Sequence, residues 1–381
     1  MAQASLEPVR VSFVSSHALG GGSERYLELL LGSLDPAWVG GLISLQDGPF
    51  VERMRSLGHT VEVVPTSARA GIARSAPRLR RALRRQAPDV VHANGVKAAL
   101  AAGLATPGTG IPVLWLKHDY SWDGPLARMV ALRSRRVVAV SGAITTTFGK
   151  RLGSRVTVVP NGVPLHERER EVGREIVEQL VGAGSAPVVL LVGRLHPAKG
   201  QLELVEAVPR VLERCPDARF LVLGEEDPTQ PEYAVKVRRR VHDLDVGSVV
   251  HFAGHRNDPM RVMSGTDLML MPSVPDERGA GKEACPFALL EAMSVGTPVV
   301  AYAAGGIPEV LGDCGRLVAE GDRAALADAI ADLLEDSGER SRASACALER
   351  VRARHHLSGM VEAMERLYRE TARVPPRSAG R

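Results

Sequence analysis

Short apolar runs alternate with longer amphipathic stretches along the N-terminal part of the chain. The runs lie at residues 11–14, 42–45, 61–64, 90–92, 113–116, 137–140 and 156–159. Strands buried on both faces of a parallel sheet give runs of this kind, and most of the intervals are long enough for crossover helices. The pattern therefore predicts an α/β domain.

The same rhythm restarts after a polar interval at 161–187, in which Gly182 and Gly184 indicate a linker that contains a helix. Further apolar runs follow at 188–192, 220–223, 249–252, 268–271, 298–301 and 316–318. We therefore place one Rossmann-like domain at 1–170 and a second at 171–355, both doubly wound.

After residue 318 the apolar spacing becomes helical, as at 324–334 and 360–368. We expect a C-terminal helix within 356–381 that packs back on the N-terminal domain. The chain ends in a short segment rich in Pro and Arg, 375–381, which is expected to be disordered.

Length and composition narrow the class of protein. The 381 residues exceed the size at which single cores stop growing, which favours two domains. No apolar run reaches the roughly 18 residues that a membrane-spanning helix needs. The N-terminus shows neither the charged start nor the apolar stretch of a secretory signal, so we expect a cytoplasmic protein.

The cysteines are widely scattered along the chain. They are Cys215, Cys285, Cys314 and Cys346. Their spacing matches neither a metal site nor a redox motif, so we expect reduced, mostly structural thiols.

A basic run at 78–85 stands out in a chain of net charge +4. Leu79, Ala82 and Leu83 recur within it at helical spacing, which places the arginines on the opposite face. A solvated helix face is the favoured interpretation. The alternative is peripheral contact with anionic lipid at the inner face of the membrane. We predict no nucleic-acid partner, and the sequence does not indicate the oligomeric state.

A glycine-rich turn, Gly20 to Gly22, lies between the first expected strand and a helical run. Such a turn lets backbone amides at a helix N-terminus approach an anion, although it can also serve only for close packing. It does not match the dinucleotide fingerprint Gly-x-Gly-x-x-Gly, because Arg25 stands where the last glycine would be.

Two cations follow the first expected strand of the second domain. Arg194 and Lys199 are five residues apart and adjoin Gly193 and Gly200. A guanidinium offers bidentate contacts and a lysine adds a point charge, so the pair suits a diphosphate leaving group. Two surface cations on an ordinary loop are the alternative.

Two carboxylates, Glu283 and Glu291, flank an apolar stretch, and a helix is expected from Phe287 onward. A capping acid and an exposed helix acid would be the ordinary explanation. The interval is too apolar for Glu291 to be plainly solvated, however. Because carboxylates accept hydrogen bonds from vicinal diols, one acid could bind a sugar and the other a ribose.

Together these motifs resemble glycosyltransferase family 4, the retaining enzymes of the GT-B fold, over nearly the whole chain and in the family's order. The matching motifs lie at 21–25, 118–119, 139–141, 160–163, 193–195 with 199–200, 272–273 and 283–293. The resemblance implies two Rossmann-like domains facing across a cleft. It also implies retaining transfer of a sugar from a nucleotide-diphosphate sugar to a hydroxyl group.

Carried over by position, the resemblance implies that Arg194 and Lys199 bind the donor diphosphate. Glu283, at the sugar hydroxyls, and His118, near the anomeric centre, are the implied catalytic residues, and Glu291 would hold the ribose. The other implied donor-binding positions are Gly21, Gly22, Cys285, Pro286, Phe287 and Ala288. No metal or other cofactor is required, and a UDP-sugar is the expected donor substrate.

Two departures from the family pattern affect the donor loop. Pro286 stands where many relatives have glycine, and it cannot donate an N–H. The segment 274–282 is longer than the shortest family versions and is a candidate mobile flap. Glu277 within it competes with Glu283 for the sugar contact, but the spacing to Glu291 favours Glu283.

Acceptor-side candidates are assigned only by their position in the N-terminal domain. They are His17, Asn94, Lys97, Asp119, Tyr120, Trp122 and Asp123. The abundance of Ala and Arg is typical of a GC-rich bacterial genome. The expected acceptors are accordingly a specialised metabolite or a lipid-linked or envelope glycan precursor.

Four alternatives are weighed at this stage. Asp243 and Asp245 have the spacing of a metal-binding Asp-x-Asp motif, although residues at a helix end are the better explanation. A nucleotide-sugar 2-epimerase would share the architecture, and a non-catalytic nucleotide-sugar- or carbohydrate-binding protein would share the binding groups. A pyridoxal-dependent phosphorylase would need a Schiff-base lysine, for which we find no candidate.

Overall fold

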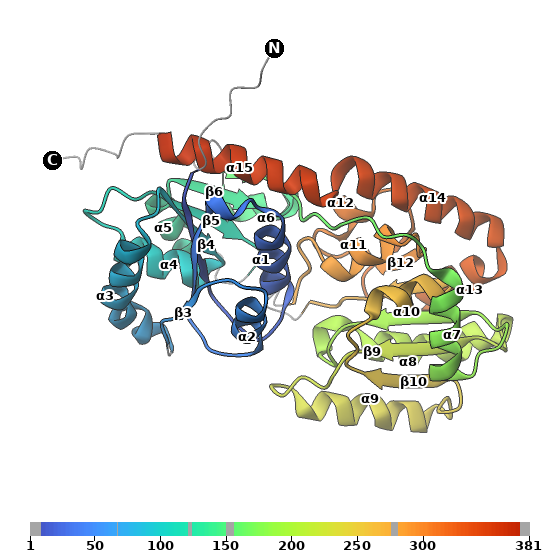
Figure 1. The fold of residues 1–381 in the computed structure, drawn as a ribbon. Helices are drawn as coiled ribbons and strands as arrows, with labels where there is room; N and C mark the ends of the chain where they lie inside the picture. The colour runs from blue at the N-terminus through green and yellow to red at the C-terminus, as the bar shows by residue number, and fades with distance from the viewer. Residues whose placement is uncertain (1–8, 67, 121–123, 150–155, 276–280, 374–381) are drawn as a thin grey trace, which may run out of the picture. The chain divides into compact units, whose positions relative to one another are not determined.

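The computed structural model describes residues 9–66, 68–120, 124–149, 156–275 and 281–373. The chain divides into two compact units: unit 1 is Met1–Asn161 with Leu357–Arg381, and unit 2 is Gly162–His356. Each unit is built on its own parallel sheet (Figure 1). The expected doubly wound α/β fold is therefore confirmed for both halves of the chain.

Unit 1 contains, in its described part, a seven-stranded sheet of order β3-β2-β1-β4-β5-β6-β7. The strands are β1 (Val11–Ser15), β2 (Val39–Ser44), β3 (Val61–Val63), β4 (Val90–Asn94), β5 (Val113–Lys117), β6 (Arg136–Ala139) and β7 (Val156–Val158). The strand order reverses between β1 and β4, which pair in parallel, and ligands of such folds bind outside the strand ends at this point.

Helices connect these strands and include one from the end of the chain. They are α1 (Gly22–Ser33), α2 (Pro49–Ser56), α3 (Ala68–Gln86), α4 (Val96–Ala105), α5 (Pro125–Arg133), α6 (Gly142–Thr145) and α15 (Leu357–Arg373). Helix α15 packs against α1, β4 and β5. Its buried Tyr368 hydroxyl lies 2.7 Å from Nδ1 of the buried His92 in β4, so the last helix is part of the core of unit 1.

The described part of unit 2 repeats the arrangement with a six-stranded sheet of order β10-β9-β8-β11-β12-β13. The strands are β8 (Val188–Val192), β9 (Arg219–Leu223), β10 (Val250–Gly254), β11 (Leu268–Met271), β12 (Val299–Tyr302) and β13 (Arg316–Val318). The helices are α7 (Arg170–Val181), α8 (Gln201–Arg214), α9 (Pro231–Asp243), α10 (Pro259–Gly265), α11 (Phe287–Ser294), α12 (Ile307–Leu311), α13 (Arg323–Glu335) and α14 (Ser337–Arg354). The reversal of strand order here falls between β8 and β11.

Unit 2 begins earlier than the boundary expected at residues 170 and 171. Helix α7 crosses α10 with Gly173 against Gly265, and a Cβ built on Gly173 would lie 2.3 Å from the carbonyl oxygen of Arg261. Arg170 and Arg174 also pair with Asp267. These contacts hold α7 on unit 2, and the pair between Glu169 and Arg261 holds the residue before the helix there as well.

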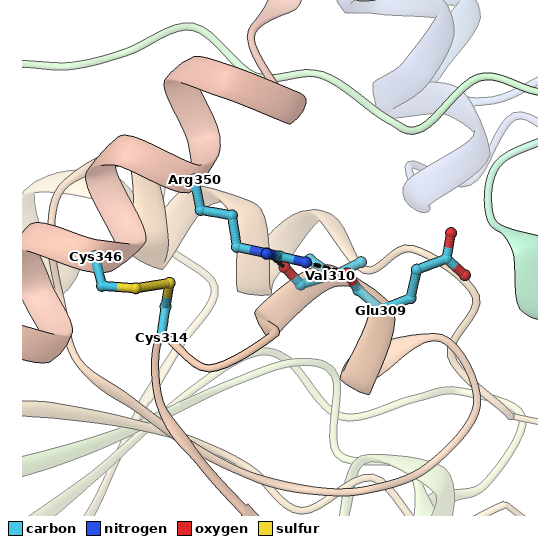
Figure 2. The surroundings of a disulfide bond; sticks show 5 residues. All are labelled: Glu309, Val310, Cys314, Cys346 and Arg350. Atoms are coloured by element: carbon cyan, nitrogen blue, oxygen red, sulfur yellow. Dashed lines mark hydrogen bonds between the residues drawn. A yellow bond between two sulfur atoms is a disulfide. The ribbon is translucent and has the colours of Figure 1, made fainter.

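A disulfide joins Cys314, in the turn between α12 and β13, to Cys346 in α14, with their Cα atoms 5.1 Å apart (Figure 2). The expectation of reduced thiols was wrong for this pair, while Cys215 and Cys285 are thiols. The two bonded positions are 32 residues apart, and only the packing of α14 over that turn brings them together.

The basic run lies in helix α3, where Leu79, Ala82 and Leu83 are buried. Arg78, Arg81, Arg84 and Arg85 are exposed, as the solvated-face interpretation predicts. Arg85 pairs with Glu62 of β3. Among the described residues, we find no helix whose length and apolar character would allow it to cross a membrane.

Candidate active site

The turn after β8 carries the two predicted diphosphate-binding cations on a tightly fixed backbone. The Gly193 N–H donates to the Leu223 carbonyl and the Leu195 N–H to the Glu225 carbonyl, each at 2.8 Å, so the parallel pairing continues past the sheet. Gly200 has φ +72°, and a Cβ there would lie 1.9 Å from the Pro272 carbonyl oxygen. Only glycine fits this second turn, which ends the short 3-10 helix Pro197–Lys199.

Each of the two cations is partly exposed and paired with a more buried acid. Arg194 Nη1 lies 3.1 Å from Oδ2 of Asp227, and their side chains are 47% and 4% exposed. Lys199 Nζ donates to Oε1 of Glu283, and these side chains are 38% and 14% exposed. The site therefore presents fixed positive charge together with carboxylate oxygens, which suits a phosphorylated, hydroxylated ligand.

The loop before α11 brings Glu283 to this cluster. The N–H of Gly306 donates to the Glu283 carbonyl at 2.8 Å, and a Cβ on Gly306 would lie 1.8 Å from the carbonyl oxygen of Ala284. The turn Gly305–Gly306 therefore packs against the backbone of the loop at Glu283 and Ala284 and holds it in place. Cys285 and Phe287 are buried, whereas Glu291 is half-buried, in keeping with the apolar interval noted in the sequence.

Pro286 takes the N-cap position of α11, with φ −71° and ψ 127°. Its missing N–H lies outside the helical hydrogen-bond ladder, so proline is tolerated here. The first amides of a helix have no partner within the helix, and Phe287 and Ala288 supply such amides at this end. Backbone donors for an anion are thus present although Pro286 supplies none.

In unit 1 the glycine-rich turn leads directly into α1. The Gly21 N–H donates to Oε2 of the buried Glu24 at 2.7 Å, so a side chain of the same turn already satisfies this amide. Gly22 is the first residue of the helix, so its N–H has no acceptor within the helix and can donate to a ligand.

His118 follows β5 and is held by a side chain at the end of β4. Its Nε2 lies 2.6 Å from Oδ1 of Asn94, whose Nδ2 donates to the Ser23 carbonyl at 2.9 Å. Because the amide oxygen of Asn94 accepts, Nε2 of His118 carries the proton and Nδ1 is the acceptor nitrogen. Burial lowers the pKa of His118 to about 4, although the charge of Asp119 raises it, so the ring is neutral near pH 7.

The acceptor-side candidates lie in different environments. Asn94 is buried and engaged with His118 and Ser23, so we assign it to the orientation of His118. Lys97 Nζ donates to the Thr66 carbonyl at 3.2 Å, and His17 and Asp119 are exposed. Tyr120 is half-buried. Trp122 and Asp123 lie outside the described residues, as do Glu277 and most of the 274–282 segment.

Sequence reasoning missed two residues of the site, Asp227 and Gln201. Asp227 stands in a run of acids after β9 that is typical of a solvated loop. Gln201 is fully buried at the start of α8, and its Nε2 donates to the Arg194 carbonyl at 2.9 Å. Asp227 carries no local signal because its partner Arg194 lies on another segment, and Gln201 acts on backbone carbonyls, which a side-chain pattern does not reveal.

Asp243 and Asp245 mark the end of α9. Asp243 is the last residue of the helix, and Asp245 has φ 52° with its N–H donating to the His242 carbonyl. Both belong to the turn that ends the helix. Within the described part of the chain, no group of three His, Cys, Asp or Glu side chains is placed to hold a metal ion.

A cavity of about 360 Å³ lies elsewhere in unit 2, beside the first residues of α7 and α10. Its lining residues are His166, Glu167, Glu169, Asn257, Asp258, Pro259, Met260, Arg261, Ser264 and Val295. None of the site residues predicted from the sequence lines this cavity.

Comparison with known proteins identifies the family. Residues 20–167 match the model for Glycosyltransferase Family 4, and residues 186–336 match the one for Glycosyl transferases group 1. The GDP-mannose-dependent alpha-(1-6)-phosphatidylinositol monomannoside mannosyltransferase of Mycobacterium tuberculosis is 31% identical over 306 residues, which cover 76% of this chain and 71% of the relative. The 2-deoxystreptamine N-acetyl-D-glucosaminyltransferase of Streptomyces fradiae is 30% identical over 323 residues, 77% of this chain and 74% of the relative.

Solved structures share the fold at lower identity. The crystal structure of Anabaena HepE in complex with UDP has a TM-score of 0.83 at 23% identity and covers 95% of this chain and all of its own. A glycosyltransferase from Rickettsia africae has the same TM-score at 19% identity, covering 97% of this chain and 100% of its own. The chain therefore belongs to glycosyltransferase family 4 and is a glycosyltransferase of the GT-B type.

Proposed function

We propose that the protein transfers a hexosyl group, with retention of anomeric configuration and without a metal ion, from a nucleoside-diphosphate sugar to a hydroxyl group of an acceptor. The observation that carries the proposal is the cluster in unit 2. There the partly exposed Lys199 pairs with Glu283, just before the N-terminus of α11, and the partly exposed Arg194 lies on the same turn after β8 as Lys199. Cations, a carboxylate and backbone amides together match the diphosphate and the hydroxyl groups of such a donor.

The transfer requires little covalent chemistry from the protein. The acceptor oxygen bonds to the anomeric carbon while the bond from that carbon to the β-phosphate oxygen breaks, and the electron pair leaves with the nucleoside diphosphate. The acceptor proton passes to the departing phosphate oxygen, so no side chain is needed as a base. Arg194 and Lys199 stabilise the negative charge that develops on the leaving group.

The remaining roles follow the family resemblance. Glu283 accepts hydrogen bonds from hydroxyl groups of the transferred sugar, and Glu291 accepts them from the ribose diol. The amides of Phe287 and Ala288 donate to the phosphate. The neutral His118, oriented by Asn94, acts near the anomeric centre, where an uncharged ring does not repel the positive charge of an oxocarbenium-like transition state.

The nucleobase expected from the sequence differs from the one that appears in the names of several relatives. The sequence-based expectation of a UDP-sugar stays a prediction, whereas several relatives are named for GDP-mannose. GDP-mannose is therefore the first donor to test, with UDP-hexoses beside it. Relatives are also named for inositol phosphates, phosphatidylinositol mannosides or 2-deoxystreptamine. Each of these named compounds contains a cyclitol ring, so we propose a cyclitol hydroxyl as the acceptor group.

The exposed arginines of α3 would favour an acceptor embedded in anionic lipid. Arg78, Arg81 and Arg84 are exposed on one helix whose apolar residues face the core. Vesicle flotation tests this part of the proposal: vesicles containing phosphatidylinositol should bind the protein, and Arg81→Glu with Arg84→Glu should abolish binding. Equal recovery of wild type and variant with the vesicles would contradict it.

Calorimetric titration of GDP, UDP and their hexose conjugates tests the donor site. We expect one nucleotide series to bind and Glu291→Ala to weaken it by about tenfold or more, because a ribose bidentate contact is lost. Glu232→Ala, which removes an exposed acid from the first turn of α9, is the matched control and should bind as wild type does. Binding of no nucleotide would contradict the proposal.

Two other functions fit the same binding groups, and products separate them. A 2-epimerase would convert the donor without an acceptor, and a binding protein would hold it unchanged. Neither predicts that nucleoside diphosphate release depends on an added hydroxyl acceptor.

A further inference from the structure

The backbone and the side chain of Arg194 are held by two residues, Gln201 and Asp227, that the family motif does not include. The side-chain amide of the fully buried Gln201 donates to the carbonyl oxygens of Gly193 and Arg194, at 3.3 and 2.9 Å. Asp227 engages Nη1 of the guanidinium at 3.1 Å. Backbone and side chain of Arg194 are thus fixed from two different segments.

Asp227 is itself fixed. Its Oδ1 accepts from the N–H of Thr229 at 2.9 Å and from the Thr229 hydroxyl at 2.6 Å, which leaves Oδ2 for Arg194. The two loops touch through their backbones, since a Cβ on Gly224 would lie 2.0 Å from the carbonyl oxygen of Gly193. The Thr229 hydrogen bonds fix the carboxylate on its loop, and the backbone contact fixes that loop against the one that carries Arg194.

Asp227 also stays ionised. Burial raises the pKa of its carboxyl group, but the hydrogen bonds from Thr229 and the charges of Arg194 and His196 outweigh burial, and the pKa is lowered. Among the described residues, Asp227 is the ion-pair partner of the Arg194 guanidinium, through Nη1. The Arg194 side chain is 47% exposed, so the guanidinium stays open to an anion.

We propose that Asp227 is a positioning residue for sugar transfer, which holds the Arg194 guanidinium in the orientation that binds the donor diphosphate. The inference rests on the proposed function, because it requires that Arg194 bind the donor. An arginine on a loop loses side-chain freedom when it binds, and a pre-oriented fork loses less. Because Asp227 orders the Arg194 side chain when the protein folds, this side-chain entropy is not lost again when the donor binds.

Asp227 could also weaken donor binding, since a carboxylate near a diphosphate repels it. Orientation and repulsion predict opposite signs for Asp227→Asn, which keeps the shape of the side chain and removes its charge. Our inference requires weaker binding and slower turnover in this variant.

The experiment measures the affinity for GDP and UDP by calorimetry, and donor KM and kcat, for four single variants and one double variant. Asp227→Asn should weaken nucleoside diphosphate binding about tenfold and lower kcat as well as raise donor KM. Glu226→Gln, the same change at the neighbouring exposed acid that pairs with Arg238, should stay within about twofold of wild type. Asp227→Glu should restore part of the loss.

The fourth variant is Arg194→Ala, alone and combined with Asp227→Asn. If Asp227 acts through Arg194, the double variant should bind like Arg194→Ala alone. A further tenfold loss in the double variant would assign Asp227 a structural role and overturn the inference, as would unchanged or tighter binding by Asp227→Asn alone. If Arg194→Ala itself binds normally, the proposed donor site fails and the inference fails with it.

Thr229→Val provides a second test if Asp227→Asn does not fold. It removes the hydroxyl that fixes Oδ1 and leaves the charge of Asp227 in place. A loss of nucleotide affinity of about threefold is expected, in the same direction as for Asp227→Asn. Unchanged affinity would contradict the inference.

Discussion

Removing the disulfide Cys314–Cys346 should destabilise unit 2 strongly. The bond ties the turn after α12 to α14, and Arg350 of the same helix donates from Nε to the Val310 carbonyl at 2.6 Å and from Nη2 to the Glu309 carbonyl at 2.7 Å (Figure 2). Cys346→Ser breaks the covalent link and leaves these two hydrogen bonds in place. The variant therefore isolates the contribution of the bond.

The magnitude follows from the length of the closed loop. For positions 32 residues apart, loop closure lowers the entropy of the unfolded chain by an amount worth about 3.7 kcal/mol at 25 °C. A unit of this size loses about 2–4 °C in melting temperature per kcal/mol, so the transition of unit 2 should fall by about 7–15 °C.

The assay combines thiol titration with thermal unfolding. Denatured wild-type chain should titrate two thiols, Cys215 and Cys285, before reduction and four after it. Reducing agent should lower the melting temperature of wild type to that of Cys346→Ser, whereas Cys215→Ser should retain the sensitivity to reductant. Four reactive thiols in unreduced protein, or a shift of less than about 2 °C on reduction, would refute the reasoning.

Two further predictions concern the fold. Gly173→Val should lower the free energy of unfolding of unit 2 by about 3 kcal/mol or more, or prevent its folding, because a Cβ there would lie 2.3 Å from the Arg261 carbonyl oxygen. Urea unfolding measures the effect, and the control Gly32→Ala, at an open helical position, should be neutral or stabilising. A Gly173→Val variant as stable as wild type would contradict the α7–α10 contact. Burial lowers the pKa of His118 to about 4 and, with the charge of His118, that of His92 to about 3. The unfolded state therefore binds more protons below about pH 6.5, so the free energy of unfolding should fall on acidification by up to about 1.4 kcal/mol per pH unit for each ring. His118→Gln should flatten this dependence, and the exposed His242→Gln should not. A profile that is flat from pH 7 to pH 5 would contradict the lowered pKa values of both rings.

The parts of the molecule that depend on local sequence could be predicted. Apolar runs such as 188–192 gave the strands, and the glycines beside Arg194 and Lys199 marked a turn that only glycine can form at Gly200. Right-handed crossovers between parallel strands then leave few topologies, so the doubly wound order follows.

The parts that depend on distant contacts could not be predicted. Asn94 has the appearance of an acceptor ligand in the sequence, but pairing of β4 with β5 places it next to His118. Cys314 and Cys346 have no diagnostic spacing, and Asp227 reaches Arg194 only because β8 and β9 are neighbours. In each case the partner is set by the order of strands or the packing of helices, which a local pattern does not contain.

The most direct test of the central claim is to identify the products formed from GDP-mannose or a UDP-hexose and a cyclitol acceptor. We predict one glycoside whose anomeric configuration is that of the donor, together with one nucleoside diphosphate per glycoside and no loss of rate in EDTA. NMR of the anomeric proton decides the configuration, and mass spectrometry counts the transferred sugar. A product of inverted configuration, or release of nucleoside diphosphate that does not depend on an acceptor, would contradict the account.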